Sequence, residues 1–183
     1  TSKIGTIGIF GVTPIYEIWK YSNKNNSIMK LEYEIEGGAI LQKLGDYLLL
    51  IKGDSIVKYD GNSFVTIQNF TTGSGGVGNN FVYNNEIYFE ITLKQTDGSY
   101  KRGLYSTDGT INGMSKVADL TGIERYTIHK GILYFTALEG TTGGYKLFRT
   151  DGTSLGTYKI SGNLTYTYNL CSLNNYLFFT SGG

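Results

Sequence analysis

The residue types best suited to chemistry in this sequence are aspartates that each precede a glycine. Asp60-Gly61, Asp108-Gly109 and Asp151-Gly152 recur between alternating runs, and the last two pairs lie in the tetrapeptide TDGT. Repeated loop carboxylates are typical ligands of hard cations, but a calcium loop concentrates several oxygens and each of these turns offers one. A short aspartate can instead accept hydrogen bonds from backbone N–H groups two residues further on, with neighbouring threonines closing the turn. We therefore predict no metal site and assign a structural turn role to Asp60, Gly61, Asp108, Gly109, Thr110, Asp151, Gly152 and Thr153.

A glycine-rich segment, GSGGVG at residues 73–78, matches the pattern G-x-G-x-x-G. Dinucleotide binding by this pattern requires a preceding strand and a helix that begins at the glycines. The residues that follow, NNFVYN, are typical of a turn and a strand, so no helix terminus is available for a pyrophosphate. We predict a linker between structural units and no cofactor.

The remaining reactive side chains form no recognisable set. The chain has one histidine, His129, and one cysteine, Cys171. We expect the cysteine to be buried on a strand as a small apolar side chain, and we expect no metal or triad role for the histidine. Glu86 and Glu90 could form a glycosidase-type carboxylate pair with Asp97 or Glu139, but nothing in their spacing singles them out. They are expected to be solvated charges near strand ends, and no catalytic residue is predicted.

Aromatic residues are abundant, with 16 Tyr and 9 Phe among 183 residues. Most are expected to pack between structural units. Tyr126, Tyr166 and Tyr168 lie near predicted strand starts on one rim, where exposed rings could stack on sugars. They are the candidate ligand-binding residues.

Composition excludes several classes of partner. A formal charge of +1 gives no electrostatic drive toward nucleic acid or an anionic membrane. The longest strongly apolar run, residues 47–51, is far shorter than the ~20 residues that span a bilayer. With 26 Gly and one Pro, the chain is suited to many tight turns between strands.

Alternation at period two predicts strands throughout and no helix. After a strand at residues 6–12 that ends near Pro14, strands are expected at 15–21, 28–35, 39–43, 46–52, 55–59, 63–68, 77–82, 86–93, 101–106, 113–118, 126–129, 132–138, 144–150, 156–160, 166–172 and 176–180.

Similar segments recur along the chain. The TDGT tetrapeptides are about 43 residues apart, and the tetrads ILYF (132–135) and YLFF (176–179) are about 44 apart. Four short strands in such a period are typical of a propeller blade. The predicted fold is all-β: a β-propeller-like array of about four four-stranded antiparallel blades. The expected units are 1–35 (partial), 36–70, 77–119, 124–162 and 163–183 (partial); a sandwich of similar strand number is the alternative.

The two partial units each hold about half a blade. They could join into one shared blade and close a ring of four, which would leave no open sheet edge. We favour the other solution, in which the chain is a piece of a larger ring.

The segments ILYFTA (132–137), GGYKLFRTDGT (143–153) and GT (156–157) resemble the ELWxxDGT repeat of large bacterial surface and secreted proteins. The copy at 87–120 is similar, with Tyr105 in place of Trp and Met114 in place of Thr. EIWK at 17–20 resembles the repeat core without a following DGT, and the turn at Asp60 keeps only the Asp-Gly pair. The resemblance implies a propeller-like fold in an extracellular, adhesin-like protein and carries over no catalytic residue.

The expected function is that of a non-enzymatic extracellular binding or structural module within a larger surface assembly. Its partners would be other domains or subunits, with a glycan or protein as ligand. The alternatives are a carbohydrate-binding propeller and part of a propeller glycoside hydrolase.

Overall fold

The computed structural model describes residues 15–36, 40–52, 54–139, 143–160 and 162–182. Over these ranges the chain folds entirely into antiparallel strands joined by turns, as alternation at period two requires. These ranges contain no helix, and so none long enough to cross a membrane. The all-β prediction is confirmed.

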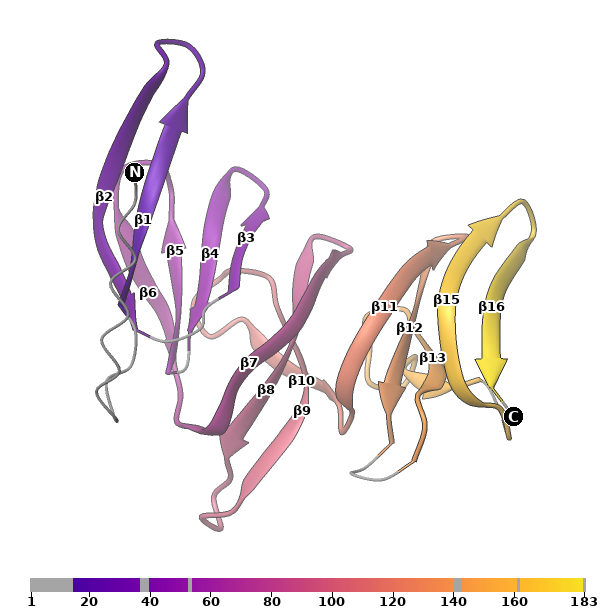
Figure 1. Ribbon diagram of the computed structural model, residues 1–183. Coiled ribbons are helices and arrows are strands. Elements are labelled where there is room, and N and C mark those ends of the chain that lie inside the picture. Colours follow the sequence, from indigo (N-terminus) through magenta and orange to yellow (C-terminus); the bar gives the residue numbers. More distant parts are fainter. Residues whose placement is uncertain (1–14, 37–39, 53, 140–142, 161, 183) are drawn as a thin grey trace, which may run out of the picture.

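Twelve consecutive strands form three four-stranded sheets (Figure 1). Sheet I contains β3 (Ile40–Leu44), β4 (Tyr47–Lys52), β5 (Ser55–Tyr59) and β6 (Phe64–Asn69). Sheet II contains β7 (Thr72–Tyr83), β8 (Glu86–Lys94), β9 (Tyr100–Thr107) and β10 (Met114–Ala118). Sheet III contains β11 (Thr121–His129), β12 (Ile132–Leu138), β13 (Lys146–Thr150) and β14 (Tyr158–Lys159). In each sheet the strands pair in sequence order, so every connection is a hairpin.

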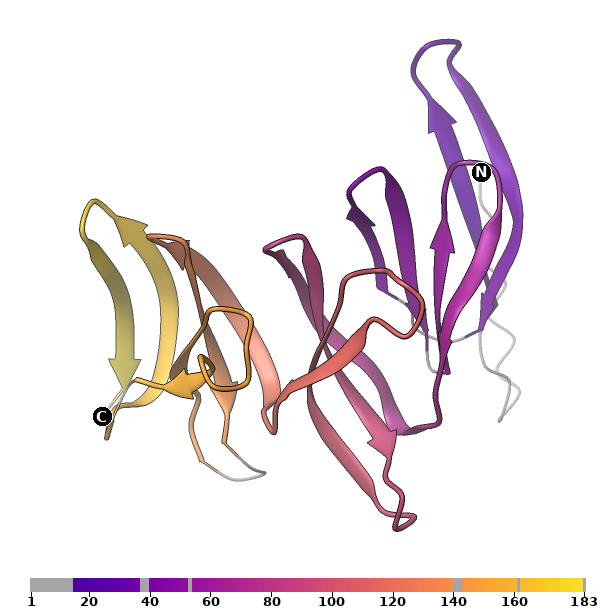
Figure 2. The same ribbon diagram turned by 180° about the vertical axis from the view of Figure 1, so that it is seen from behind.

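Two hairpins flank the three sheets. The N-terminal hairpin pairs β1 (Ile15–Ser22) with β2 (Ser27–Glu36), and the C-terminal hairpin pairs β15 (Thr165–Leu173) with β16 (Tyr176–Gly182). They lie at opposite ends of the row of sheets in both Figure 1 and Figure 2 and remain separate two-stranded sheets. The shared blade weighed from the sequence is therefore not present.

Apolar clusters fill the spaces between successive sheets. In β4, Leu49 and Ile51 join residues of sheet II such as Phe89 in one cluster, whereas Leu50 joins Ile18 of the N-terminal hairpin in another. A third cluster contains Phe81 of sheet II and Phe135 of sheet III. Because successive side chains of a strand point to opposite faces, a central strand with few polar residues buries both faces. This explains why the tetrads YLLL and ILYF are almost wholly apolar.

The first strands of neighbouring sheets contact one another: β3 contacts β7, β7 contacts β11, and β11 contacts β15. In Figure 1 the strands β7, β11 and β15 lie toward the viewer. Each of these three strands carries two register shifts against its partner. Such bulges increase local twist and re-aim side chains, so the irregular strands line one side of the row.

Every strand predicted from residue 15 onward is present, with boundaries shifted by a few residues. The largest error concerns residues 73–78, which were expected to be a linker and instead form the first half of β7. Pairing of Thr72 with Leu93 and of Val77 with Ile91 outweighs the low strand propensity of glycine. The strand expected at 6–12 and its end at Pro14 lie outside the described residues.

Candidate functional site

The aspartates of the two TDGT turns make the hydrogen bonds that the sequence predicted. Oδ1 of Asp108 accepts from the backbone N–H and the hydroxyl of Thr110, at 2.9 and 2.7 Å. Oδ1 of Asp151 accepts from the same groups of Thr153, at 2.9 and 2.8 Å. One oxygen of each carboxylate is thus engaged twice within its own turn.

The glycine of each TDGT turn is required by conformation and by space. Gly109 and Gly152 have φ values of 75° and 104°, in the left-handed region. A Cβ at Gly109 would lie 2.8 Å from the Tyr47 hydroxyl, and one at Gly152 would lie 2.8 Å from the Tyr88 hydroxyl. Tyr47 also donates to the carbonyl oxygen of Asp108, at 3.1 Å. Each turn is therefore a contact point for a tyrosine of the preceding sheet.

A further glycine of the repeat, four residues after the first, was not assigned a role from the sequence. A Cβ at Gly113 would collide with the Asp108 carboxylate, and a Cβ at Gly156 would collide with that of Asp151. The final glycine of D-G-T-x-x-G is therefore needed because the aspartate side chain occupies its Cβ position. The fixed spacing from the aspartate was the available signal.

Hydrogen bonding lowers the pKa of the turn aspartates. For Asp108 the main cause is the hydroxyl of Thr110, followed by its N–H. For Asp151 the N–H of Thr153 comes first, and for Asp60 the N–H of Ser63. Donors directed at the charged form favour ionisation, so these turns are built for aspartate in its carboxylate state.

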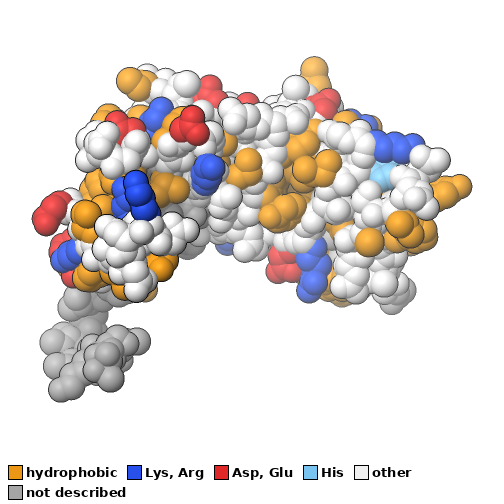
Figure 3. Space-filling model, turned by 90° about the horizontal axis from the view of Figure 1, so that it is seen from above, with side chains coloured by type: hydrophobic (Ala, Val, Ile, Leu, Met, Phe, Trp, Pro, Cys, Tyr) orange, Lys and Arg blue, Asp and Glu red, His pale blue; other side chains and the backbone are white. Residues whose placement is uncertain are grey.

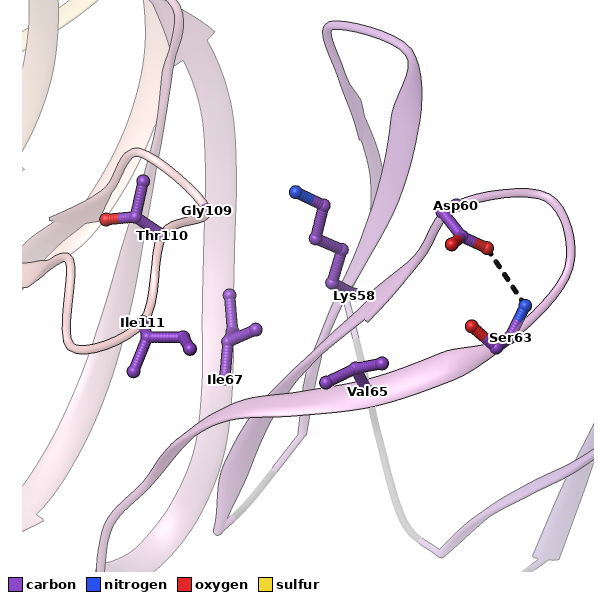
Figure 4. Close-up of a pocket in the computed structure, with 8 residues that line it drawn as sticks. All are labelled: Lys58, Asp60, Ser63, Val65, Ile67, Gly109, Thr110 and Ile111. Carbon is purple, nitrogen blue, oxygen red and sulfur yellow. Dashed lines mark hydrogen bonds between the residues drawn. The ribbon is translucent and has the colours of Figure 1, made fainter.

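The turn at Asp60 borders a hollow between sheets I and II (Figure 4). Oδ1 of Asp60 accepts from the N–H groups of Asn62 and Ser63, both at 2.9 Å. The hollow has a volume of about 320 Å³ and is lined by Lys58, Asp60, Ser63, Val65, Ile67, Gly109, Thr110 and Ile111. The hollow brings together turn residues of two sheets. Its walls are apolar apart from the turn residues and the amine of Lys58. That amine lies 3.7 Å from the centre of the Tyr47 ring, so it is held by a cation–π contact.

A second hollow lies where the first strands of sheets II and III meet. It measures about 400 Å³ and is lined by Asn79, Phe81, Ile123, Glu124, Arg125 and Tyr126. The Tyr126 ring packs 5.1 Å from that of Phe81 while 53% of the residue stays exposed. Exposed aromatic surface, a guanidinium, a carboxylate and an amide converge here, which is the lining expected of a site for a polar ligand.

The other two predicted tyrosines lie on β15, the strand that contacts β11. The guanidinium carbon of Arg125 is 5.6 Å from the centre of the Tyr168 ring, so Arg125 links Tyr126 on β11 to Tyr168 on β15. Tyr168 also packs against Tyr145, whose hydroxyl donates to Glu124 at 2.9 Å. Burial, followed by this bond, raises the pKa of Tyr145. Tyr166 is nearer the start of β15, against Gly144. We name Asn79, Glu124, Arg125, Tyr126 and Tyr168 the first-strand strip.

The prediction for Glu90 was wrong. It is 1% exposed at the centre of β8, ion-paired with the Nε of Arg102 on β9. Its oxygens accept from the N–H groups of Gly122 (2.8 Å) and Ile123 (3.2 Å) in β11. These donors are left unpaired by the register shift of that strand, so Glu90 fastens sheet II to sheet III. The single acidic residue in the apolar run IYFEITL was the signal.

The other carboxylates of the suggested glycosidase pair have separate partners. Asp97 accepts from the hydroxyl and N–H of Ser99, and Glu139 pairs with Lys159 on β14. Within the described ranges, no group of three His, Cys, Asp or Glu residues is arranged to hold a metal ion.

His129 and Cys171 differ in their surroundings. His129 is 8% exposed, and its Nδ1 lies 2.9 Å from the hydroxyl of Ser172 in β15, so it links sheet III to the C-terminal hairpin. Cys171, predicted to be buried, is exposed. Within the described part of the chain, the C-terminal hairpin packs against another sheet through the face that carries Ser172, and Cys171 lies on the opposite face.

Searches of family models, curated proteins and solved structures give no significant match to this chain.

Proposed function

We propose that the chain is a β-propeller-type structural and binding module of an extracellular bacterial surface or secreted protein, without a reaction of its own. Three sheets of identical strand order stack through apolar clusters with their first strands in contact, which supports a radial arrangement. The resemblance of residues 132–157 to a repeat of bacterial surface proteins supports the setting. Its partners would be neighbouring domains or subunits of the same assembly.

The first-strand strip carries the binding part of this proposal. Half of Tyr126 is exposed beside Arg125 and Glu124 in a hollow of about 400 Å³. An aromatic face packs against the C–H groups of a ligand while the guanidinium holds its polar groups; the Asn79 amide N–H is already donated to the carbonyl oxygen of Ile123, at 2.7 Å. Many moderate contacts on irregular strands suit recognition better than bond cleavage.

As a second and more specific proposal, the ligand of the first-strand strip is a carbohydrate. Tyr126 and Tyr168 lie on strands that contact each other, and Arg125, the chain neighbour of Tyr126, lies over the Tyr168 ring. Two rings separated by a hydrogen-bonding cation suit an uncharged or acidic sugar chain that presents C–H faces and hydroxyls in alternation.

A glycan array tests both proposals. We expect saturable binding that falls at least tenfold in Tyr126→Ala and Arg125→Ala, whose side chains are exposed and whose removal leaves the core intact. Tyr158→Ala is the matched control, since this exposed tyrosine of β14 stacks on Arg149 of β13, away from the strip. If none of the three substitutions changes the affinity for the glycan, the first-strand strip is not the binding site. Saturable turnover of a glycan or peptide that depends on one carboxylate contradicts a module without a reaction.

A further inference from the structure

The two terminal hairpins contain complementary halves of one sheet. In the complete sheets, the third strands place Ile56 and Leu104 in the cluster shared with the following sheet. Ile18 of β1 likewise lies in the cluster that the N-terminal hairpin shares with the sheet that follows it, sheet I. The N-terminal hairpin therefore corresponds to the third and fourth strands of a sheet, in agreement with the likeness of EIWK (17–20) to KLFR (146–149).

The C-terminal hairpin corresponds to the first and second strands. The tetrad YLFF of β16 matches ILYF of β12, which is the second strand of sheet III. In addition, β15 contacts β11 as β11 contacts β7. A complete sheet would therefore have the order β15-β16-β1-β2.

The side chains that such a sheet would bury are exposed in both hairpins. In second strands, Leu49 and Tyr88 pack against the following sheet, whereas Phe178 at the same position of β16 is 52% exposed. In third strands, Tyr105 and Phe148 pack against the preceding sheet, whereas Trp19 of β1 is 56% exposed. Hydrophobic side chains are visible at both ends of the molecule in Figure 3.

The strand edges fit as well. β16 pairs only with β15 among the described strands, and its sequence YLFFTSG has neither a charged residue nor a proline. Exposed edges normally carry such residues because an unprotected edge pairs with other strands. Register is given by the complete sheets: Phe89 lies opposite Tyr105 and Phe135 opposite Phe148. The same alignment places Phe179 opposite Trp19 and Phe178 opposite Lys20.

We propose that the chain associates head to tail with a second copy of itself, with β16 of one copy pairing antiparallel with β1 of the next to complete a four-stranded sheet. The two hairpins lie at opposite ends of the row and do not pair with each other (Figure 1), whereas a second copy presents the complementary strand. The contact joins two different surfaces, which builds rings or open chains rather than closed dimers.

A cysteine pair tests the register. In a Cys171→Ser background, Lys20→Cys with Phe178→Cys places the two thiols on opposing residues, within the reach of a disulfide. The matched control, Lys20→Cys with Tyr176→Cys, is displaced by two residues, about 7 Å along the strand. We expect disulfide-linked dimers and larger species at least tenfold more abundant for the first pair on a non-reducing gel. A disulfide-linked monomer would mean closure within one chain and would overturn the proposal.

Sedimentation of the unmodified chain over a range of concentrations gives an independent test. We expect concentration-dependent association, with an apparent Kd raised at least tenfold by Trp19→Asp or Phe178→Asp. These side chains are exposed, so circular dichroism of dilute samples should remain unchanged. Leu155→Asp is the control, because Leu155 is 96% exposed in the loop between β13 and β14. The proposal would be overturned if the chain stayed monomeric at all concentrations, or if neither Trp19→Asp nor Phe178→Asp changed the apparent Kd.

Discussion

The carboxylate of Asp108 occupies the space in which a side chain at Gly113 would begin. Asp151 and Gly156 repeat this relationship in the next sheet. Packing therefore explains a turn motif that resembles a cation loop. The aspartate supplies the hydrogen-bond acceptor, the glycine after it adopts the left-handed backbone conformation, and the final glycine leaves space for the carboxylate.

Gly113→Ala should destabilise the fold by about 2 kcal/mol, because the Asp108 side chain must turn away and lose its two hydrogen bonds from Thr110. Urea unfolding of the purified chain measures this difference. In an Asp108→Ala background the added methyl group meets no carboxylate, so the same substitution should cost at least about 1 kcal/mol less. Equal costs in the two backgrounds would show that the contact is not the cause.

Glu90→Ala should destabilise the protein by about 3 kcal/mol, because it leaves the N–H groups of Gly122 and Ile123 and the guanidinium of Arg102 without their acceptor. Glu139→Ala, which removes an exposed partner of Lys159, should cost less than about 1 kcal/mol. Denaturant unfolding of both variants gives the comparison. Similar losses would contradict a fastening role for Glu90.

Stability should fall with acid below about pH 4. The folded-state pKa values of Asp60, Asp97, Asp108 and Asp151 are lowered by hydrogen bonds. Their contribution is thus complete above the unfolded pKa of about 3.9 and is lost as pH falls through the folded values.

Unfolding midpoints at pH 7 and pH 3 measure this loss. Asp108→Asn keeps an acceptor but does not titrate, so its loss of stability between these pH values should be smaller than that of the unmodified chain. An unchanged pH dependence would contradict the assignment.

Phe89→Ala should cost about 3–5 kcal/mol, because this ring is fully buried between sheets I and II. Phe178→Ala, in the matching tetrad of β16, should cost less than about 1 kcal/mol in dilute solution because half of the ring is exposed. Thermal unfolding at low concentration checks both. Equal losses would mean that the outer face of the C-terminal hairpin is already covered.

Local chemistry made much of this structure predictable. Alternation of apolar and polar residues locates strands because neighbouring side chains of a strand point to opposite faces. Asp-Gly pairs locate turns because the glycine adopts the positive φ that the turn requires and the aspartate accepts hydrogen bonds from residues close in sequence. The turn hydrogen bonds of Asp108 and Asp151 were predicted for this reason. Tyr126 was expected near a strand start and instead lies inside β11, although its ring is exposed.

Features that depend on a neighbouring sheet were not predicted. The charge of Glu90 led us to expect a solvated side chain. It is buried because a bulge in β11 directs two N–H groups toward it. Residues 73–78 have the composition of a linker and extend β7 only because β8 offers them partners. Cys171 is exposed because nothing in the described part of the chain covers that side of its hairpin.

The order of amino acids by itself determined where strands and turns lie, since both follow from contacts between residues close in the chain. The tertiary structure alone decided which faces are buried, which charge is enclosed and which strand edges stay open. Whether a side chain is buried depends on the neighbouring sheet that packs against it, and the residues of that sheet lie tens of positions away in the sequence.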